Sequence, residues 1–268
     1  MAARDAGFVD VALASDGRFD SDPQAIYDRW QEFRDWAQQA GLRDGVQVAP
    51  EDLGPPVPRP RQVFAAALNY RSPGSVGAAP EVPVVFTKYP SCLVGPVADV
   101  ALPSALVDYE VELVVVIGRP AAAVAERDAW DHVAGVTVGQ DLTDRELVSH
   151  DPTGQLCLPK SFPGFGPTGP WVLTADEPAA RGELELEAIL SGERMQHDTT
   201  AAMIFPVAEL IARISAVCPL FAGDLLFTGT PSGIGISRDP PRYLRDGDVL
   251  VSRIGGIGEI TQHFHAGP

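Results

Sequence analysis

Apolar residues near the start of the chain recur with the period of a helix. The stripe consists of Ile26, Trp30, Phe33 and Ala37. Spacings of four, three and four place these side chains on one helical face. Asp22 suits the N-cap, Pro23 the first helical position and Gly41 the stop. The pattern therefore predicts an amphipathic helix over residues 22–41, with its aromatic stripe packed against a core.

Two later stretches predict shorter helices. Residues 126–134 form the first, and Gly135 is a natural end for it. Pro206 opens the second, because proline is tolerated at the start of a helix. The apolar face of this second helix consists of Val207, Leu210, Ile211 and Ile214.

The other apolar stretches predict strands. Residues 62–68 and 82–86 look extended, and residues 136–141 form a short apolar run that ends in an acid. Residues 112–117 are β-branched and nearly continuous, which is typical of a strand buried on both faces. Residues 248–254 and 259–264 flank Gly255-Gly256 and predict a hairpin. Strands outnumber helices without alternating regularly with them, which favours an α+β, β-rich fold over a doubly wound or barrel fold.

A proline-rich stretch divides the chain into two predicted parts. Residues 49–61 read APEDLGPPVPRPR, a composition typical of a linker. We therefore expect a small N-terminal region with its linker over residues 1–60, and a main domain over residues 61–268.

Composition restricts the class of partner. The formal net charge is −16, which disfavours nucleic acid because phosphate binding needs clustered cations. No apolar run approaches the roughly 18 residues of a membrane span, and the first residues lack the apolar core of a secretory signal. We therefore expect a cytoplasmic protein that binds neither nucleic acid nor membrane. The three cysteines are widely spaced and predict no disulfide framework.

Two glutamates stand at the start of the strand predicted to be most buried. Glu110 and Glu112 are two residues apart, so they point to the same side of an extended chain. Buried together, they would need a cation, a basic side chain or water to offset their repulsion. Two solvated glutamates at an exposed strand edge remain the alternative at this point.

A third acid favours the interpretation that Glu110 and Glu112 are buried and bind a cation. Asp141 ends the predicted strand 136–141. Three carboxylates without a nearby His or Cys favour a hard cation, namely Mg²⁺, Mn²⁺ or Ca²⁺. Such an ion would act as a Lewis acid toward substrate oxygens. Lys88 and Lys160 are the only lysines of the chain, which indicates that a compact ammonium is needed at both positions.

An ordered series of motifs resembles the fumarylacetoacetate hydrolase family from about residue 60 to the C-terminus. The motifs are Leu68-Asn69-Tyr70, Pro83-Val84-Val85-Phe86-Thr87-Lys88, Tyr109-Glu110-Val111-Glu112-Leu113, Gln140-Asp141-Leu142-Thr143-Asp144-Arg145, Lys160-Ser161-Phe162, Gly169-Pro170-Trp171 and Thr228-Gly229-Thr230-Pro231-Ser232-Gly233-Ile234-Gly235. The resemblance implies a mixed β-roll catalytic domain, a homodimer, and a small 2-oxo or 1,3-dicarbonyl acid as substrate. It also implies reaction through an enolate stabilised by Mg²⁺ or Mn²⁺.

The same resemblance assigns roles to individual residues. It makes Glu110, Glu112 and Asp141 the metal ligands and Lys160 the active-site lysine. By motif position it makes Arg145 and Gln196 substrate contacts and Thr230 a contact for the substrate carboxylate. We further predict catalytic roles for Arg145 and Tyr70 and a substrate-binding role for Asn69.

The first motif departs from the family pattern. Family hydrolases commonly read Asn-Tyr-x-x-His-x-x-Glu, whereas this chain has Pro73 and Val76 at the His and Glu positions. Neither residue can transfer a proton. We therefore favour decarboxylation, tautomerisation or a biosynthetic enolate reaction over hydrolysis. The alternatives are a C–C bond hydrolase of acylpyruvates that uses His150 or Tyr70 as its base, and a metal-holding binding protein without turnover.

Overall fold

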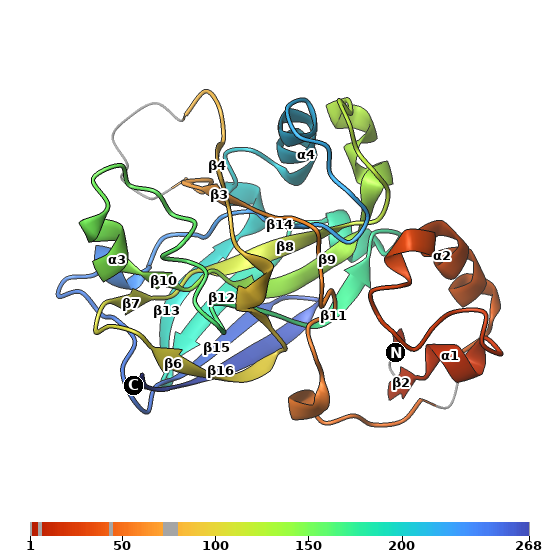
Figure 1. Cartoon of the computed structure of the whole chain (residues 1–268), viewed down its shortest axis with the longest axis horizontal. Coiled ribbons are helices and arrows are strands. Elements are labelled where there is room, and N and C mark those ends of the chain that lie inside the picture. Colours follow the sequence, from red (N-terminus) through yellow and green to blue (C-terminus); the bar gives the residue numbers. More distant parts are fainter. Residues whose placement is uncertain (1, 5–6, 43–44, 72–79, 268) are drawn as a thin grey trace.

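Two mixed β-sheets form the body of the protein (Figure 1). The computed structural model describes residues 2–4, 7–42, 45–71 and 80–267, with side chains described from residue 7 onward. The seven strands of the larger sheet are, in sheet order, β4 (Val84–Thr87), β3 (Val63–Ala67), β14 (Leu225–Phe227), β8 (Val111–Ile117), β9 (Val133–Gln140), β11 (Gly166–Thr174) and β5 (Leu93–Val94). The five strands of the smaller sheet are β13 (Glu193–Thr199), β12 (Glu185–Leu190), β15 (Val249–Ile254), β16 (Gly258–Ala266) and β6 (Val97–Leu102).

The two sheets curl around a shared core, with β15 and β16 packed against β9. Most neighbouring strands are antiparallel, and the parallel pairs are β3 with β14, β5 with β11, and β6 with β16. Two short pairs complete the strands, namely β1 (Ala2–Arg4) with β2 (Gly7–Val9), and β7 (Val107–Asp108) with β10 (Thr143–Asp144). This arrangement confirms the β-rich α+β expectation and the β-roll that the motifs implied.

Helices are few and short. The α-helices are α1 (Val11–Ala14), α2 (Trp30–Gln39), α3 (Arg145–His150) and α4 (Val207–Ser215). The 3₁₀ helices are η1 (Tyr27–Arg29), η2 (Pro50–Asp52), η3 (Pro90–Cys92), η4 (Glu126–His132), η5 (Pro178–Arg181), η6 (Thr200–Ala202) and η7 (Gly235–Ser237). Among the described residues, no helix combines the length and the apolar composition that a membrane crossing needs.

The strand predictions from apolar patterning are confirmed. Every residue of β8 is buried, as expected for a strand covered on both faces. The C-terminal hairpin forms from β15 and β16, and Gly256 in its turn has a φ of 78°. The predicted apolar face of α4 is buried in full.

Two helix predictions are wrong in extent. The first helix begins at Trp30, after η1, because the side chain of Asp22 caps a local turn by accepting a hydrogen bond from the amide of Gln24. The second stretch is a 3₁₀ helix that stops at His132, and Gly135 lies inside β9. A Cβ at Gly135 would lie 2.2 Å from the carbonyl oxygen of Leu173 in β11. That glycine therefore permits close approach of two strands and does not end a helix.

The N-terminal elements pack on the outer face of the larger sheet. Trp30 and Phe33 belong to one buried cluster with Val114, Val116 and Leu225, and the α1–α2 region lies at one end of the long axis (Figure 1). The boundary at residue 60 stays a prediction, and residues on both sides of it share a core.

This shared core makes Phe33→Leu a test of cooperativity. We expect a loss of about 1 kcal/mol in the free energy of unfolding, because leucine fills most but not all of the aromatic site. A single urea transition by both fluorescence and circular dichroism is the expected readout. Leu13→Ala is the control, since Leu13 is 78% exposed and should change stability by less than about 0.5 kcal/mol. Two separate transitions would show that the N-terminal region unfolds independently.

Candidate metal centre

Three carboxylates meet where β8 begins and β9 ends. Antiparallel pairing of Val111 with Gln140 places Asp141 beside Glu110, and the amide of Asp141 donates to the carbonyl oxygen of Glu110 at 2.9 Å. One carboxylate oxygen from each of Glu110, Glu112 and Asp141 lies within 4.8 Å of the others. The three residues are 8%, 2% and 0% exposed, so the alternative of two solvated glutamates does not describe this structure.

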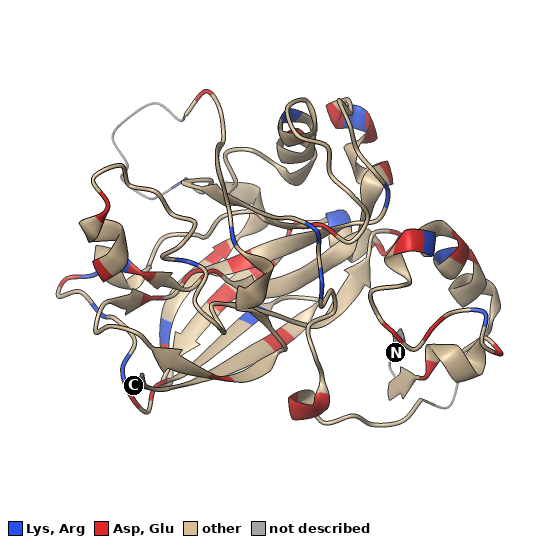
Figure 2. Cartoon of the chain, in the orientation of Figure 1, with Lys and Arg blue, Asp and Glu red and all other residues tan. Residues whose placement is uncertain are grey.

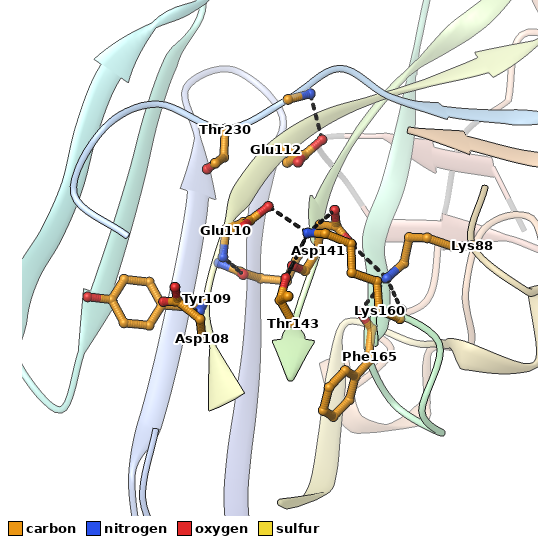
Figure 3. Close-up of polar contacts among 12 residues, drawn as sticks. Lys88, Asp108, Tyr109, Glu110, Glu112, Asp141, Thr143, Lys160, Phe165 and Thr230 are labelled. Atoms are coloured by element: carbon orange, nitrogen blue, oxygen red, sulfur yellow. Dashed lines mark hydrogen bonds and ion pairs between the residues drawn. The ribbon is translucent and has the colours of Figure 1, made fainter. Parts of the chain in front are cut away.

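Both lysines of the chain point at Asp141 (Figure 3). Lys88 follows β4 and donates from Nζ to Asp141 Oδ1 at 2.7 Å, to the carbonyl oxygen of Phe165 at 3.2 Å and to that of Lys160. Lys160 Nζ donates to Asp141 Oδ2 at 2.7 Å. Burial alone would raise the pKa of Asp141, but the two ammonium groups hold it below the ordinary value.

Lys160 also reaches the first glutamate. Its Nζ donates to Glu110 Oε2 at 2.8 Å and to the hydroxyl of Thr143 at 2.7 Å. Burial would lower the pKa of Lys160, yet the carboxylates of Asp141 and Glu110 raise it above the ordinary lysine value. Both carboxylates thus favour the ammonium form of Lys160.

Glu112 is the carboxylate of the triad that forms no ion pair among the described residues. Its Oε2 accepts a hydrogen bond from the amide of Gly229 at 2.7 Å, and no ion pair to it occurs among the described side chains. Burial raises its pKa well above the ordinary glutamate value, and the charges of Asp141 and Glu110 raise it further. Gly229 has a φ of 95°, and a Cβ there would meet Asn69 Cβ at 2.8 Å. A glycine is thus required where the backbone approaches Glu112.

Charge and donor type both fit a hard divalent cation. The cluster holds four buried acids, Asp108, Glu110, Glu112 and Asp141, against the three cations Lys88, Lys160 and Arg145. The acids exceed the cations by one, so a divalent cation would meet an uncompensated carboxylate and leave one positive charge for an anionic substrate, and an all-oxygen ligand set suits Mg²⁺ or Mn²⁺. Acidic residues outside this cluster occur on helices, turns and strands alike (Figure 2), so the overall charge alone would not have located the site.

Arg145 stands at the first position of α3 and borders the triad. Its Nη2 contacts Glu110 Oε1 at 2.5 Å and Asp108 Oδ2 at 2.8 Å. Burial would lower the pKa of Arg145, but the two carboxylates raise it, so the guanidinium is a fixed positive charge. Sequence reasoning did not assign Asp108 a role. The acids recur at every second position as Asp108, Glu110 and Glu112, and that repeat was the signal for it.

The side chains assigned to substrate binding form hydrogen bonds with other groups of the protein. Gln196 accepts from the amide of Val111 at 3.0 Å and donates to Thr230 Oγ1 at 2.8 Å. Thr230 in turn donates to the carbonyl oxygen of Val111 at 2.8 Å. Asn69 bridges the backbone of Phe205 in both directions. These side chains therefore hold the backbone around Val111 and Phe205 in place. Their direct contact with substrate stays a prediction.

The two candidate bases differ in environment. Tyr70 is buried, and its hydroxyl has no hydrogen-bond partner among the described residues. Burial raises the pKa of Tyr70, with a further contribution from the charge of Glu112, so the hydroxyl stays protonated and suits a hydrogen-bond donor. His150 is exposed at the end of α3. Pro73 and Val76, which replace the His–Glu pair of the family motif, lie outside the described residues.

The comparisons with known proteins agree with this geometry. The model for "Fumarylacetoacetate (FAA) hydrolase C-terminal" matches residues 62–265. The bovine protein "Oxaloacetate tautomerase FAHD2B, mitochondrial" is 38% identical over 209 residues, which cover 76% of this chain and 67% of the bovine one. The chain therefore belongs to the fumarylacetoacetate hydrolase family.

Solved structures of similar proteins extend the agreement to the fold. A "putative HpcE protein" from Mycobacterium smegmatis superposes with a TM-score of 0.93 at 47% identity, covering 99% of this chain and 96% of that one. The 5-carboxymethyl-2-hydroxymuconate delta-isomerase from the same organism has a TM-score of 0.72 at 31% identity, covering 81% of this chain and 82% of that one. Family members with tautomerase and isomerase names are thus among its relatives.

Proposed function

We propose that the chain is a divalent-metal-dependent isomerase that interconverts the enol and keto forms of a small 2-oxo dicarboxylic acid such as oxaloacetate. The observation that carries the proposal is the buried triad with one uncompensated carboxylate, Glu112, beside the cations Lys160 and Arg145. The names of the bovine tautomerase and the mycobacterial isomerase support the same reaction class. The first motif has Pro73 and Val76 in place of the family's His–Glu pair, which fits a reaction that consumes no water.

The reaction moves one proton and one double bond. The enol loses the proton of its C2 hydroxyl, C3 gains a proton, and the C2=C3 double bond becomes C2=O. Lys160, held as an ammonium by Glu110 and Asp141, suits electrostatic stabilisation of an oxygen on which negative charge develops. Arg145 suits a substrate carboxylate, because guanidinium geometry matches carboxylate oxygens. Tyr70 suits hydrogen-bond donation to a substrate oxygen, since its hydroxyl is unpartnered among the described residues and burial keeps it protonated.

Glu110, Glu112 and Asp141 would hold the cation, with Mg²⁺ or Mn²⁺ ahead of Ca²⁺. When bound, it would supply a Lewis acid for the adjacent oxygens of a 2-oxo acid.

Enol oxaloacetate provides the direct test. We expect the purified protein with Mg²⁺ or Mn²⁺ to accelerate loss of the enol absorbance over the buffer rate, and excess EDTA to abolish that acceleration. Acylpyruvates should be cleaved slowly by the same preparation. Rapid acylpyruvate cleavage that His150→Ala abolishes would establish the hydrolase alternative instead. Tight metal binding without turnover across a dicarbonyl panel would favour a binding protein.

Two further expectations belong to the proposal. A homodimer follows from the family resemblance, and light scattering after size exclusion would measure it. A cytoplasmic location stays a prediction, and the bovine relative is named as mitochondrial.

A further inference from the structure

Asp108 is an acid whose hydrogen-bonding capacity is used entirely by the protein. Its side chain is fully buried. Oδ1 accepts from the amides of Tyr109 at 2.9 Å and Gly235 at 2.6 Å. Oδ2 accepts from the amide of Ile236 at 3.2 Å and from Nε of Arg145 at 2.9 Å, and Nη2 of Arg145 lies at ion-pair distance from it. With both oxygens saturated, Asp108 has no lone pair left for a metal ion or a substrate, so any effect it has on the reaction passes through these partners.

The contact with Arg145 fixes one edge of the guanidinium. Nε and Nη2 lie 2.9 and 2.8 Å from the same oxygen of Asp108. No hydrogen bond or ion pair of Nη1 occurs among the described residues. The side chain of Arg145 is 13% exposed, against 0% for Lys88 and 3% for Lys160. Arg145 is thus the cation of the cluster with a solvent-facing end, and Asp108 determines which end that is.

The other contacts of Asp108 tie this arginine to the glycine-containing turn that follows β14. Gly235 and Ile236 donate their amides to it, and Thr230 of the same turn region is linked to β8. A Cβ at Gly235 would lie 2.6 Å from Asp108 Oδ1 and 2.2 Å from the carbonyl oxygen of Arg242. A side chain at that position would therefore push the turn away from the carboxylate. Asp108 connects two segments that border the triad.

We propose that Asp108 is a positioning residue that acts on the substrate through Arg145. It holds the Nε–Nη2 edge so that Nη1 is presented to a substrate carboxylate, and it fixes the turn at Gly235 relative to that guanidinium. The inference rests on the proposed function for the identity of the substrate. Loss of such an orienting partner typically weakens ligand binding or activity by about 10-fold to 100-fold.

The test compares Asp108→Asn, Arg145→Met and the double variant in the Mg²⁺-loaded protein. Asparagine keeps the shape of Asp108 but must turn an N–H group toward one set of donors. We expect KM for oxaloacetate to rise about 10-fold to 100-fold with kcat changed less, and the dissociation constant for oxalate by calorimetry to rise in parallel. In the double variant, Asp108→Asn should add less than about twofold to the effect of Arg145→Met, because coupled residues are not additive.

Asp144→Asn is the matched control. Asp144 is buried close by and caps α3 through the amides of Glu146 and Leu147, but it makes no contact with the Arg145 guanidinium among the described hydrogen bonds. Asparagine is also a good N-cap, so KM should stay within about twofold. The proposal would be overturned if the increases in KM caused by Asp108→Asn and Arg145→Met multiplied in the double variant. It would also be overturned if Asp108→Asn left KM unchanged.

A crystal structure of Asp108→Asn separates this inference from the proposed function. We expect the Arg145 side chain to leave its position beside residue 108, whatever the protein turns over. An Arg145 that stays in place would overturn the positioning role even if oxaloacetate is the substrate. Failure of the wild-type protein to tautomerise oxaloacetate, with Arg145 displaced in the variant and oxalate binding weakened, would overturn the function and leave the positioning role standing.

Discussion

Replacing Glu112 by glutamine is expected to stabilise the metal-free protein at neutral pH and to remove its response to Mg²⁺. Glu112 is buried, makes no ion pair among the described residues, and has a pKa raised by burial and by its acidic neighbours, which outweigh the charge of Lys160. Removing its charge relieves a cost of about 1–3 kcal/mol. The glutamine oxygen can still accept the hydrogen bond from Gly229. The free energy of unfolding in EDTA, from urea titration, should therefore rise.

The pH dependence follows from the sign of the shift. Because the folded pKa of Glu112 is raised, its contribution to stability is complete below the unfolded pKa of about 4.3 and is lost as pH rises through the folded pKa. The advantage of Glu112→Gln should accordingly be largest at neutral pH and should vanish at low pH. Mg²⁺ should raise the melting temperature of the wild type by mass action and leave that of the variant unchanged.

Glu110→Gln is the contrasting control. Glu110 pairs with both Lys160 and Arg145, so neutralising it leaves those cations with less compensation and should destabilise the metal-free protein. Both variants should lose the response to Mg²⁺, with opposite changes in EDTA. If Glu112→Gln also lost stability in EDTA, the account of Glu112 as the uncompensated carboxylate would be wrong.

Apolar periodicity was sufficient to predict the strands that form the site. The nearly continuous β-branched run over residues 112–117 predicted a strand covered on both faces, and all seven residues of β8 are buried. The predicted face of α4 and the C-terminal hairpin followed from the same kind of pattern. The N-terminal helix shows the limit of local signals, because Asp22 and Pro23 are equally suited to the turn that precedes η1.

The contacts inside the site required three-dimensional information. Glu110, Glu112 and Asp141 were predicted as a set, but nothing in their spacing indicates that Glu112 alone lacks a cation. The saturation of Gln196 and Asn69 depends on backbone groups of residues far away in the sequence. The same holds for Lys88, whose three acceptors come from residues 141, 160 and 165.

These contacts make Lys88→Met the single substitution with the largest expected loss of stability. The side chain of Lys88 is fully buried, and it is one of two cations that hold Asp141 ionised. Methionine keeps the length of the side chain but leaves Asp141 with Lys160 alone. Removing one partner of a buried ion pair costs about 3–5 kcal/mol. It also frees the carbonyl oxygens of Lys160 and Phe165, which loosens the turn that carries Lys160.

The contribution of Asp141 to the stability of the wild type should depend on pH in the opposite direction from the contribution of Glu112. The folded pKa of Asp141 is lowered, so its contribution to stability is present above the unfolded pKa of about 3.9 and is lost as pH falls through the folded pKa. The deficit of Lys88→Met in urea titrations should be complete at neutral pH and should shrink only below about pH 4.

A double-mutant cycle with Asp141→Asn isolates the pair. Once Asp141 is neutral, Lys88→Met no longer leaves a buried carboxylate without one of its cations. The effects of the two changes on the free energy of unfolding should therefore be non-additive by about 1–3 kcal/mol. Val217→Ala supplies the baseline, because Val217 is 89% exposed and its truncation should change stability by less than about 0.5 kcal/mol. Additive effects in the cycle would mean that Lys88 stabilises the turn through the two carbonyl oxygens and not through the charge of Asp141. Non-additive effects would instead show that Lys88 stabilises the fold through the charge of Asp141.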